Sequence, residues 1–164
     1  MKMMLRLEPK ESSAFKMEGS KPRSPMPDLG FAAQQGAPES LMVSIVEDDP
    51  RIRQLIEEEV IDEGHSTHCF GTAEEFLKVT GEIQFDLVLL DLMLPGMDGL
   101  DCLEAMNQQP ESKPCKVVIV TALNDPEKRR KALNMGATDY IMKPYIFENL
   151  SEILNKVTSK TSST

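Results

Sequence analysis

The sequence has no long apolar run. Among its 164 residues, no stretch approaches the roughly 20 consecutive apolar residues that a membrane-spanning helix needs. The N-terminus also lacks the apolar core of a secretory signal, because Arg6 interrupts the run Met3-Met4-Leu5. We therefore expect a cytoplasmic protein without membrane insertion.

Cysteine is scarce and unpaired. Cys69, Cys102 and Cys115 are odd in number and form no C-x-x-C pair, which argues against a disulfide framework and a structural zinc site. His65 and His68 lie just before Cys69, but these three residues give a metal only three candidate ligands and no convincing fourth. We expect no metal site there and interpret the three cysteines as small buried hydrophobes.

Positive charge is in deficit. The net charge is −9, and residues 1–40 contribute +1, so residues 41–164 carry −10. A fold this acidic repels nucleic acid phosphates unless a basic patch compensates. The nearest candidate, Lys128-Arg129-Arg130-Lys131, lies in a predicted helix, where a solvated helix face is the simpler interpretation and partner docking the alternative. We expect no direct nucleic-acid binding.

The chain divides near residue 40. Before it, Ser, Pro, Gln and charges of both signs occur without an apolar period. This composition predicts a flexible, disordered arm at residues 1–40, then one domain at residues 41–158 and a Ser/Thr-rich tail at residues 159–164.

From residue 41 onward, short apolar strands alternate with helices. We predict strands at 42–46, 67–70, 87–90, 117–120 and 138–142. The runs 87–90 and 117–120 are continuously apolar, as in strands buried on both faces of a parallel sheet. Right-handed crossovers between such strands predict an α/β fold with a doubly wound, five-stranded parallel sheet and helices on both faces.

Local signals place the helices between these strands. Asp49-Pro50, Thr72 and Asp125-Pro126 begin helices as N-caps, and Gly64 and Gly136 end two of them. We interpret Asp98 as a further cap and Asp86 as a strand-entry residue. Two helices show apolar stripes, listed as Ile52, Leu55, Ile56 and Val60 for the first, and Phe147, Leu150, Ile153, Leu154 and Val157 for the last.

Polar residues follow four of the predicted strands. They are Glu47, Asp48, Asp91, Thr121 and Lys143. Since parallel strands end at one edge of the sheet, where such folds bind ligands, we expect these side chains to meet. Three carboxylates about 4 Å apart repel by about 4 kcal/mol per pair at an effective dielectric near 20. The sequence therefore predicts a cation among them, Mg²⁺ above all, with Lys143 beside it.

The same residues suit phosphoryl transfer. Aspartate can accept a phosphoryl group as an acyl phosphate. A metal and a lysine would neutralise the phosphoryl oxygens, and the Thr121 hydroxyl could donate a hydrogen bond to them. Asp91 is then the predicted nucleophile.

In this pattern the sequence resembles the receiver domain of two-component response regulators, over residues 41 to about 158. The resemblance rests on Glu47-Asp48, on Asp91 with the segment 94–99 (Leu-Pro-Gly-Met-Asp-Gly), on Thr121-Ala122 and on Lys143-Pro144. The intervals also agree, with 43 residues from Asp48 to Asp91, 30 to Thr121 and 22 to Lys143. The resemblance implies a flavodoxin-like sheet of order 2-1-3-4-5.

The resemblance also implies roles for single residues. Asp91 would accept phosphate from the phosphohistidine of a histidine kinase or a histidine phosphotransfer protein. Asp48, Asp91 and the main-chain carbonyl of Met93 would ligate Mg²⁺ (or Mn²⁺), with Glu47 acting through a bound water. Lys143 would contact the phosphoryl oxygens.

The resemblance further implies a switch and an output surface. Thr121 would move toward the phosphoryl group, and the ring of Tyr140 would reorient with it. An effector protein would dock on the fourth helix, fifth strand and fifth helix of the domain.

Several functions remain open on the sequence. Because only a Ser/Thr-rich segment follows Val157, we expect a stand-alone, single-domain regulator of the chemotaxis or sporulation type, not an enzyme, that binds an effector when phosphorylated. A phosphorelay intermediate or phosphate sink is the alternative, and a phosphorylation-independent interaction module is a further one. A hydrolase of the haloacid dehalogenase type is disfavoured, because Met93 stands where that family has a second aspartate.

Overall fold

The computed structural model describes residues 39–109 and 114–161, in which five strands alternate with five helices. Most of the predicted arm, up to residue 38, and residues 162–164 lie outside the described residues. In chain order the elements are β1 Met42–Val46, α3 Pro50–Asp62, β2 Ser66–Phe70, α4 Ala73–Val79, β3 Leu87–Leu90, α5 Gly99–Asn107, β4 Lys116–Thr121, α6 Pro126–Asn134, β5 Asp139–Met142 and α7 Ile146–Thr161.

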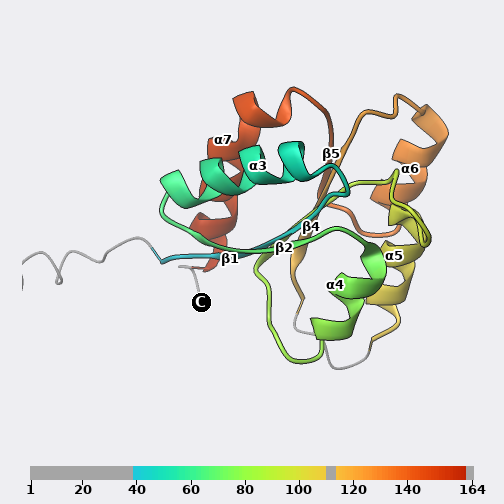
Figure 1. The fold of residues 1–164 in the computed structure, drawn as a ribbon, viewed down its shortest axis with the longest axis horizontal. Coiled ribbons are helices and arrows are strands. Elements are labelled where there is room, and N and C mark those ends of the chain that lie inside the picture. The colour runs from blue at the N-terminus through green and yellow to red at the C-terminus, as the bar shows by residue number, and fades with distance from the viewer. Residues whose placement is uncertain (1–38, 110–113, 162–164) are drawn as a thin grey trace, which may run out of the picture. The chain divides into compact units, whose positions relative to one another are not determined.

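All strand pairs are parallel, and the sheet order is β2-β1-β3-β4-β5. Helices α3 and α7 cover one face of the sheet, and α4, α5 and α6 cover the other (Figure 1). This arrangement confirms the predicted doubly wound sheet and its order.

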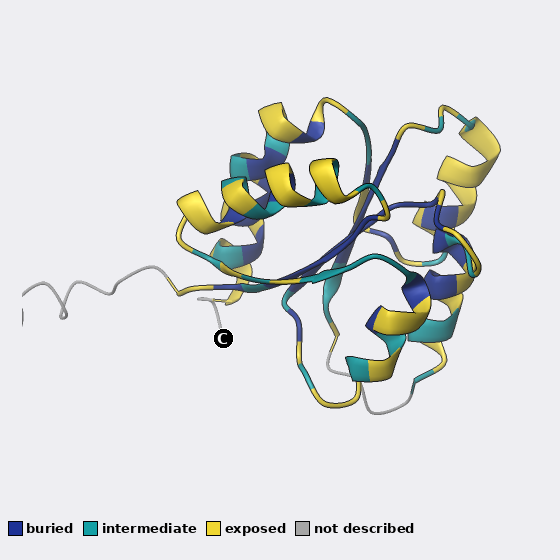
Figure 2. Ribbon diagram, in the orientation of Figure 1, coloured by how far each residue is buried: buried dark blue, intermediate teal, exposed yellow. Residues whose placement is uncertain are grey.

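The core consists of two apolar layers, one on each face of the sheet (Figure 2). Strand β3 contributes to both, because Leu87 and Leu89 face α3 and α7 while Val88 and Leu90 face the opposite helices. All four residues are buried, as expected for a continuously apolar run. Burying a side chain of this size stabilises the fold by about 1.5–3 kcal/mol.

The predicted helix starts are confirmed by side-chain caps. Asp49 accepts a hydrogen bond from the Arg51 amide at 2.8 Å, and Thr72 accepts one from the Glu75 amide at 3.1 Å. Asp98 and Asp125 cap α5 and α6 in the same way. These caps fix where each helix leaves the loop that follows its strand.

Two predicted apolar stripes are partly wrong. Leu55 is 54% exposed and Phe147 is 38% exposed, although both were expected to face the core. On α7 the buried position belongs to Ile146, four residues before Leu150, and Phe147 is rotated about 100° from it. Leu55 is rotated equally far from the buried Ile56.

Other local features refine the predictions. Helix α7 continues to Thr161, into the segment expected to be a tail. Only Cys102 is buried, whereas Cys69 and Cys115 are half-buried, and all three are free. His65 Nδ1 accepts a hydrogen bond from the Leu41 amide at 3.1 Å. Within the described residues, no helix is both long and apolar enough to cross a membrane.

Candidate functional site

Three carboxylates gather where β1 and β3 end. The two strands are neighbours, and the Asp91 amide donates to the carbonyl oxygen of Val46 at 3.1 Å. Glu47, Asp48 and Asp91 each place a carboxylate oxygen within 4.8 Å of the others. Glu47 and Asp91 are buried, whereas Asp48 is exposed. The predicted acidic site therefore forms, with one side open to solvent.

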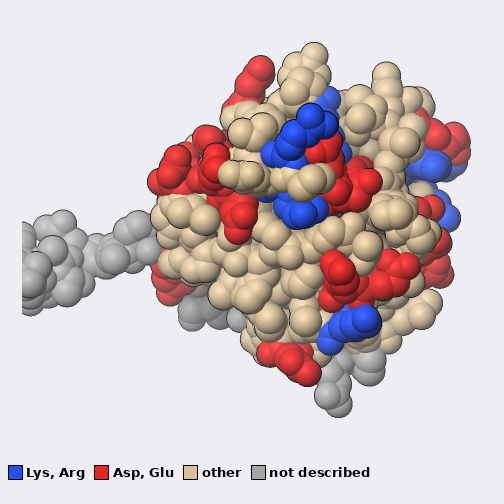
Figure 3. Space-filling view, in the orientation of Figure 1, with Lys and Arg blue, Asp and Glu red and all other residues tan. Residues whose placement is uncertain are grey.

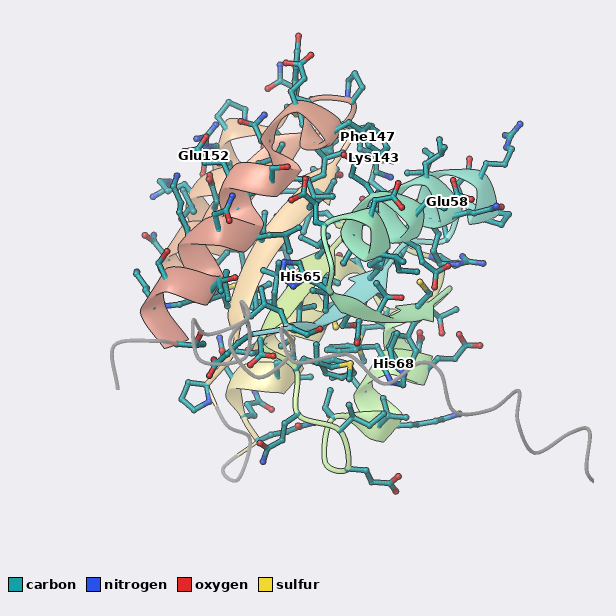
Figure 4. The ribbon with its side chains drawn as sticks, turned by 90° about the vertical axis from the view of Figure 1, so that its left-hand side faces the viewer. Glu58, His65, His68, Lys143, Phe147 and Glu152 are labelled. Atoms are coloured by element: carbon teal, nitrogen blue, oxygen red, sulfur yellow. The ribbon has the colours of Figure 1, made fainter. Side chains whose placement is uncertain are left out.

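Lys143 joins this cluster from the end of β5, beside the start of α7 (Figure 4). Its main-chain amide donates to the carbonyl oxygen of Thr121 at 2.9 Å. Its Nζ lies 2.8 Å from Asp91 Oδ2 and also contacts Glu47 Oε2, and the side chain is only 15% exposed. One lysine thus lies between the two buried acids.

Burial and pairing act against each other on the charges of the site. Burial raises the pKa of Glu47, and the charge of Asp91 adds to the rise, although hydrogen bonds from Lys143 and the Asp49 amide oppose it. For Lys143, burial alone would lower the pKa, but the hydrogen bonds to Asp91 and Glu47 outweigh it and raise the pKa. The lysine therefore stays cationic at neutral pH.

The loop after β3 holds the Asp91 carboxylate in a defined orientation. The Met93 amide donates to Oδ1 at 3.1 Å, while Lys143 binds Oδ2. The main chain is equally constrained at Gly99, where a Cβ atom would lie 2.3 Å from the carbonyl oxygen of Asp91. Only glycine fits so close an approach.

The same loop is also held at its tip. The Met97 amide donates to Glu74 Oε1 at 2.9 Å, and this contact lowers the pKa of Glu74. Gly96 beside it has φ +77°, and a Cβ there would lie 2.6 Å from the same carboxylate oxygen. Helix α4 thus anchors the loop that carries Asp91 and Met93.

Thr121 and Tyr140 are linked through one residue. The Thr121 hydroxyl accepts a hydrogen bond from the Leu123 amide at 3.2 Å, and the Tyr140 hydroxyl donates to the Leu123 carbonyl at 2.6 Å. Both side chains are buried, and the Arg129 guanidinium lies 5.7 Å from the centroid of the Tyr140 ring. The end of β4, the start of α6 and β5 are therefore physically connected.

Arg53 also contacts the site, although the sequence pattern did not predict it. Its Nη1 donates to the carbonyl oxygen of Glu47 at 2.6 Å and to that of Asp48 at 3.5 Å. Long side chains in a helix point back toward its N-terminus, and Arg53 lies one turn after the cap Asp49. That spacing is the signal that could have identified the contact.

The acidic cluster fits a hard divalent cation. Mg²⁺ binds oxygen ligands at about 2.0–2.1 Å, so two ligands on opposite sides of one ion lie about 4.2 Å apart. The carboxylate oxygens within 4.8 Å of one another thus need a small shift, or a water in place of one of them. Lys143 contacts both Glu47 and Asp91, so among these three acids Asp48 is the one that the lysine leaves to an ion.

The comparisons with known proteins agree with this site. Residues 43–155 match the family model of the response regulator receiver domain. The chain is 35% identical to the two-component response regulator PhoP of Pseudomonas aeruginosa over 118 residues, which cover 72% of this chain and 52% of that relative. It is 31% identical to the regulatory protein AtoC of Escherichia coli, covering 70% of this chain and 24% of AtoC. The chain thus spans about half or less of these relatives.

Solved structures show the same fold. A CheY-like receiver domain protein from Methanospirillum hungatei is 30% identical, with a TM-score of 0.68, and the match covers 76% of this chain and 98% of that one. The receiver domain of a signal transduction histidine kinase from Syntrophus aciditrophicus is 26% identical, with a TM-score of 0.69 over 76% of this chain and 95% of that one. Receiver domains generally bind Mg²⁺ through an acidic pocket and interact with histidine kinases and effectors. By its family match and its relatives, this chain belongs to the response regulator receiver domains.

Proposed function

We propose that this chain is a response regulator that accepts a phosphoryl group on Asp91 and signals by phosphorylation-dependent binding to another protein. The observation that supports this proposal is the orientation of the Asp91 carboxylate. It is held between the Met93 amide and Lys143, with two further acids beside it. The nucleophile is thus held in place before a phosphoryl donor binds.

In the proposed signalling reaction the phosphoryl donor is a phosphohistidine, on a histidine kinase or a histidine phosphotransfer protein. A carboxylate oxygen of Asp91 bonds to phosphorus as the phosphorus–nitrogen bond breaks. The bonding electrons stay on the imidazole nitrogen, which takes a proton from water, and the product is an aspartyl phosphate. Lys143 lies within hydrogen-bond distance of Asp91 and would contact the phosphoryl oxygens.

A divalent cation completes this site in the proposal. Asp48, Asp91 and the main-chain carbonyl of Met93 would hold Mg²⁺ or Mn²⁺, with Glu47 binding through a water. The ion would neutralise charge on the transferring phosphoryl group. Lys143 alone balances only one of the three carboxylates.

The output surface in this proposal consists of α6, β5 and α7. Thr121 would leave Leu123 to bind the phosphoryl group, and Tyr140 would reorient with it. The shared contact at Leu123 supports this coupling, because a change at either hydroxyl alters the same loop. Arg129, over the Tyr140 ring, would carry the change to the exposed face of α6.

The partner on this surface is proposed to be a protein. The net charge of −10 on residues 41–164 disfavours direct binding to nucleic acid. We further propose that the protein acts in the cytoplasm as a signalling domain, without enzymatic turnover beyond its own phosphorylation and dephosphorylation.

The test is the intact mass of the protein after incubation with Mg²⁺ and acetyl phosphate. We expect one phosphoryl adduct that requires Mg²⁺ and is lost in Asp91→Asn. Asp86→Asn is the matched control, because it makes the same change at the other end of β3 and should retain the adduct. No adduct from acetyl phosphate or from a phosphohistidine protein would overturn the proposal in favour of a phosphorylation-independent interaction module.

A phosphorelay intermediate or phosphate sink is the second candidate. The Met93 side chain, two residues after the acceptor, is 57% exposed, so it is not packed into the core beside Asp91, and in this candidate function water or a second histidine reaches the acceptor on that side. The decay of the adduct after donor removal separates the two functions. A long lifetime indicates an effector-binding signal, and rapid loss indicates a relay or sink.

A further inference from the structure

Arg53 touches the acidic loop without contacting its carboxylates. It lies on α3, and its guanidinium Nη1 donates to the Glu47 carbonyl at 2.6 Å and lies 3.5 Å from the Asp48 carbonyl. Both acceptors belong to the main chain of the two residues that end β1. Figure 3 shows basic side chains next to acidic ones at this end of α3.

The Glu47 carbonyl lies just beyond the end of β1, where a side-chain donor can fix the course of the main chain. The Glu47 amide still pairs with the Phe70 carbonyl of β2, and β1 ends one residue earlier at Val46. Arg53 therefore binds the main chain where it turns from the strand into the loop. A hydrogen bond with a charged donor is roughly twice as strong as a neutral one.

Arg53 also spans two loops. Its Nη1 lies 3.6 Å from the position a Cβ atom would take on Gly71, in the loop between β2 and α4. Glu75 accepts a hydrogen bond from the Gly71 amide at 3.2 Å, which holds that loop from the other side. Arg53 is half-buried and lies between these two segments, so its geometry is more constrained than that of a fully exposed arginine.

The charge of Arg53 and its geometry have opposite consequences for a metal. As a cation near three carboxylates, Arg53 repels Mg²⁺ and lowers its affinity. As an anchor of the Glu47-Asp48 main chain, it holds the Asp48 carboxylate beside Asp91 and raises the affinity. Because Arg53 binds carbonyl oxygens, it leaves the carboxylates to the ion and to Lys143.

We propose that Arg53 is a positioning residue that sets the Mg²⁺ affinity of the site by fixing the main chain of Glu47 and Asp48. This inference rests on the proposed function, in which the acidic cluster binds Mg²⁺. Residues that orient metal ligands typically contribute 10–100-fold in metal affinity.

The test compares Arg53→Met with Arg51→Met. Arg51 lies on the same turn and carries the same charge, but its side chain is 88% exposed and its guanidinium Nε is 3.6 Å from Asp49. Mg²⁺ affinity is measured by isothermal titration calorimetry on the full chain, and folding by urea denaturation. We expect Arg53→Met to bind Mg²⁺ about tenfold more weakly. Arg51→Met should bind it equally or slightly more tightly, because it removes only a repelling charge.

Two further measurements separate positioning from general stability. Arg53→Lys keeps the charge and should give an intermediate affinity, because the lysine Nζ is one bond closer to the main chain than the Nη1 atom that contacts both carbonyls. In phosphorylation by acetyl phosphate, Arg53→Met should need more Mg²⁺ for half-maximal rate, whereas the rate at saturating Mg²⁺ returns to that of the unchanged protein. If Arg53→Met does not fold, Arg53→Lys decides the question alone.

An Arg53→Met protein that binds Mg²⁺ as tightly as Arg51→Met would overturn the inference and leave the proposed function intact. An unchanged affinity in Arg53→Lys when Arg53→Met is unfolded would do the same. A failure of the unchanged protein to bind Mg²⁺ would instead refute the metal site itself. The two failures are thereby distinguished.

Discussion

Two aspartates flank the same strand and have different surroundings. Asp86 precedes β3, and its carboxylate accepts a hydrogen bond from the Met42 amide of β1 at 2.8 Å. Asp91 follows β3, and its carboxylate is crowded by Glu47 and Asp48 and contacts Lys143. The first acid joins two strands at the amino end of the sheet, whereas the second belongs to a cluster of like charges at the carboxyl end.

Position in the sheet decides the role of each of these aspartates. At the amino end, the Asp86 carboxylate accepts a hydrogen bond from the main chain of β1 and so stabilises the pairing of β1 with β3 directly. At the carboxyl end, the acids are held close despite their repulsion, because the loops after β1 and β3 are fixed by glycine, lysine and main-chain contacts. Such a cluster reduces stability until a cation binds, which suits a site selected for chemistry.

The largest change in stability is expected when the cationic side chain at the carboxyl end of the sheet is removed. Lys143→Met should lower the free energy of unfolding by about 3 kcal/mol in Mg²⁺-free buffer, because two buried carboxylates lose their partner. Added Mg²⁺ should restore part of the loss. Urea denaturation with and without Mg²⁺ measures both, and Lys156→Met, in an exposed pair with Glu152, should change little. Equal losses of unfolding free energy in Lys143→Met and Lys156→Met would contradict the expected difference between the buried and the exposed ion pair.

The pH dependence of this contribution follows from the pKa of Lys143. Its pKa in the folded protein lies above the ordinary value of 10.5. The ion pairs therefore stabilise the fold fully below pH 10.5, and the contribution is lost as the pH rises through the folded pKa. The gap in unfolding free energy between the unchanged protein and Lys143→Met should be constant near neutral pH and narrow in strong alkali.

The next largest change in stability is expected when the Asp86 hydrogen bond at the amino end of the sheet is removed. Asp86→Ala should lower the free energy of unfolding by about 2 kcal/mol, because the Met42 amide loses a charged acceptor. Phosphorylation and Mg²⁺ affinity should be unchanged. Asp86→Asn keeps an acceptor oxygen and should recover much of the stability in the same urea titration. A loss of phosphorylation in Asp86→Ala would show that the two ends are not independent.

A smaller effect of opposite sign is expected at the carboxyl end. Asp48→Asn should raise the free energy of unfolding in Mg²⁺-free buffer by about 1 kcal/mol, the repulsion of unit charges about 4 Å apart in water. The same variant should bind Mg²⁺ poorly, as calorimetry would show. A variant that loses both stability and Mg²⁺ binding would mean that Asp48 has a structural role of its own.

The smallest change in stability is expected for a residue in the middle of the sheet, between its two ends. Ser44 of β1 pairs in register with Val88 of β3, and its buried hydroxyl has no hydrogen-bond partner among the described residues. Ser44→Ala should raise the free energy of unfolding by up to about 1 kcal/mol, because an unsatisfied buried hydroxyl is removed. Urea denaturation measures the gain, and a loss of stability would show that the hydroxyl packs usefully.

The strands, the caps and the edge that carries the site were predictable because their signals are local. A continuous apolar run such as 87–90 identifies a buried strand, and an Asp-Pro pair identifies a helix start. Parallel topology then brings Glu47, Asp91 and Lys143 to one edge without further information.

Other features depended on the three-dimensional neighbours. Phe147 has the right spacing for the core, but Ile146 occupies the buried position one residue earlier. Arg53 reaches carbonyl groups, which every residue has, so no residue type in the loop marks the contact. The identity of the metal ligands, the water-mediated contact of Glu47 with the ion, and the movement of Thr121 and Tyr140 on phosphorylation stay predictions.

The position of Tyr140 has an optical consequence. The chain has two tyrosines and no tryptophan, so its near-ultraviolet absorption and emission come from tyrosine, with a small contribution from phenylalanine. Tyr140 is 5% exposed and hydrogen-bonded, whereas Tyr145 is 56% exposed, and the two lie on either side of Lys143. In a Tyr145→Phe protein, Tyr140 would be the only tyrosine. Its absorption and emission would then report on the surroundings of the site without any added label.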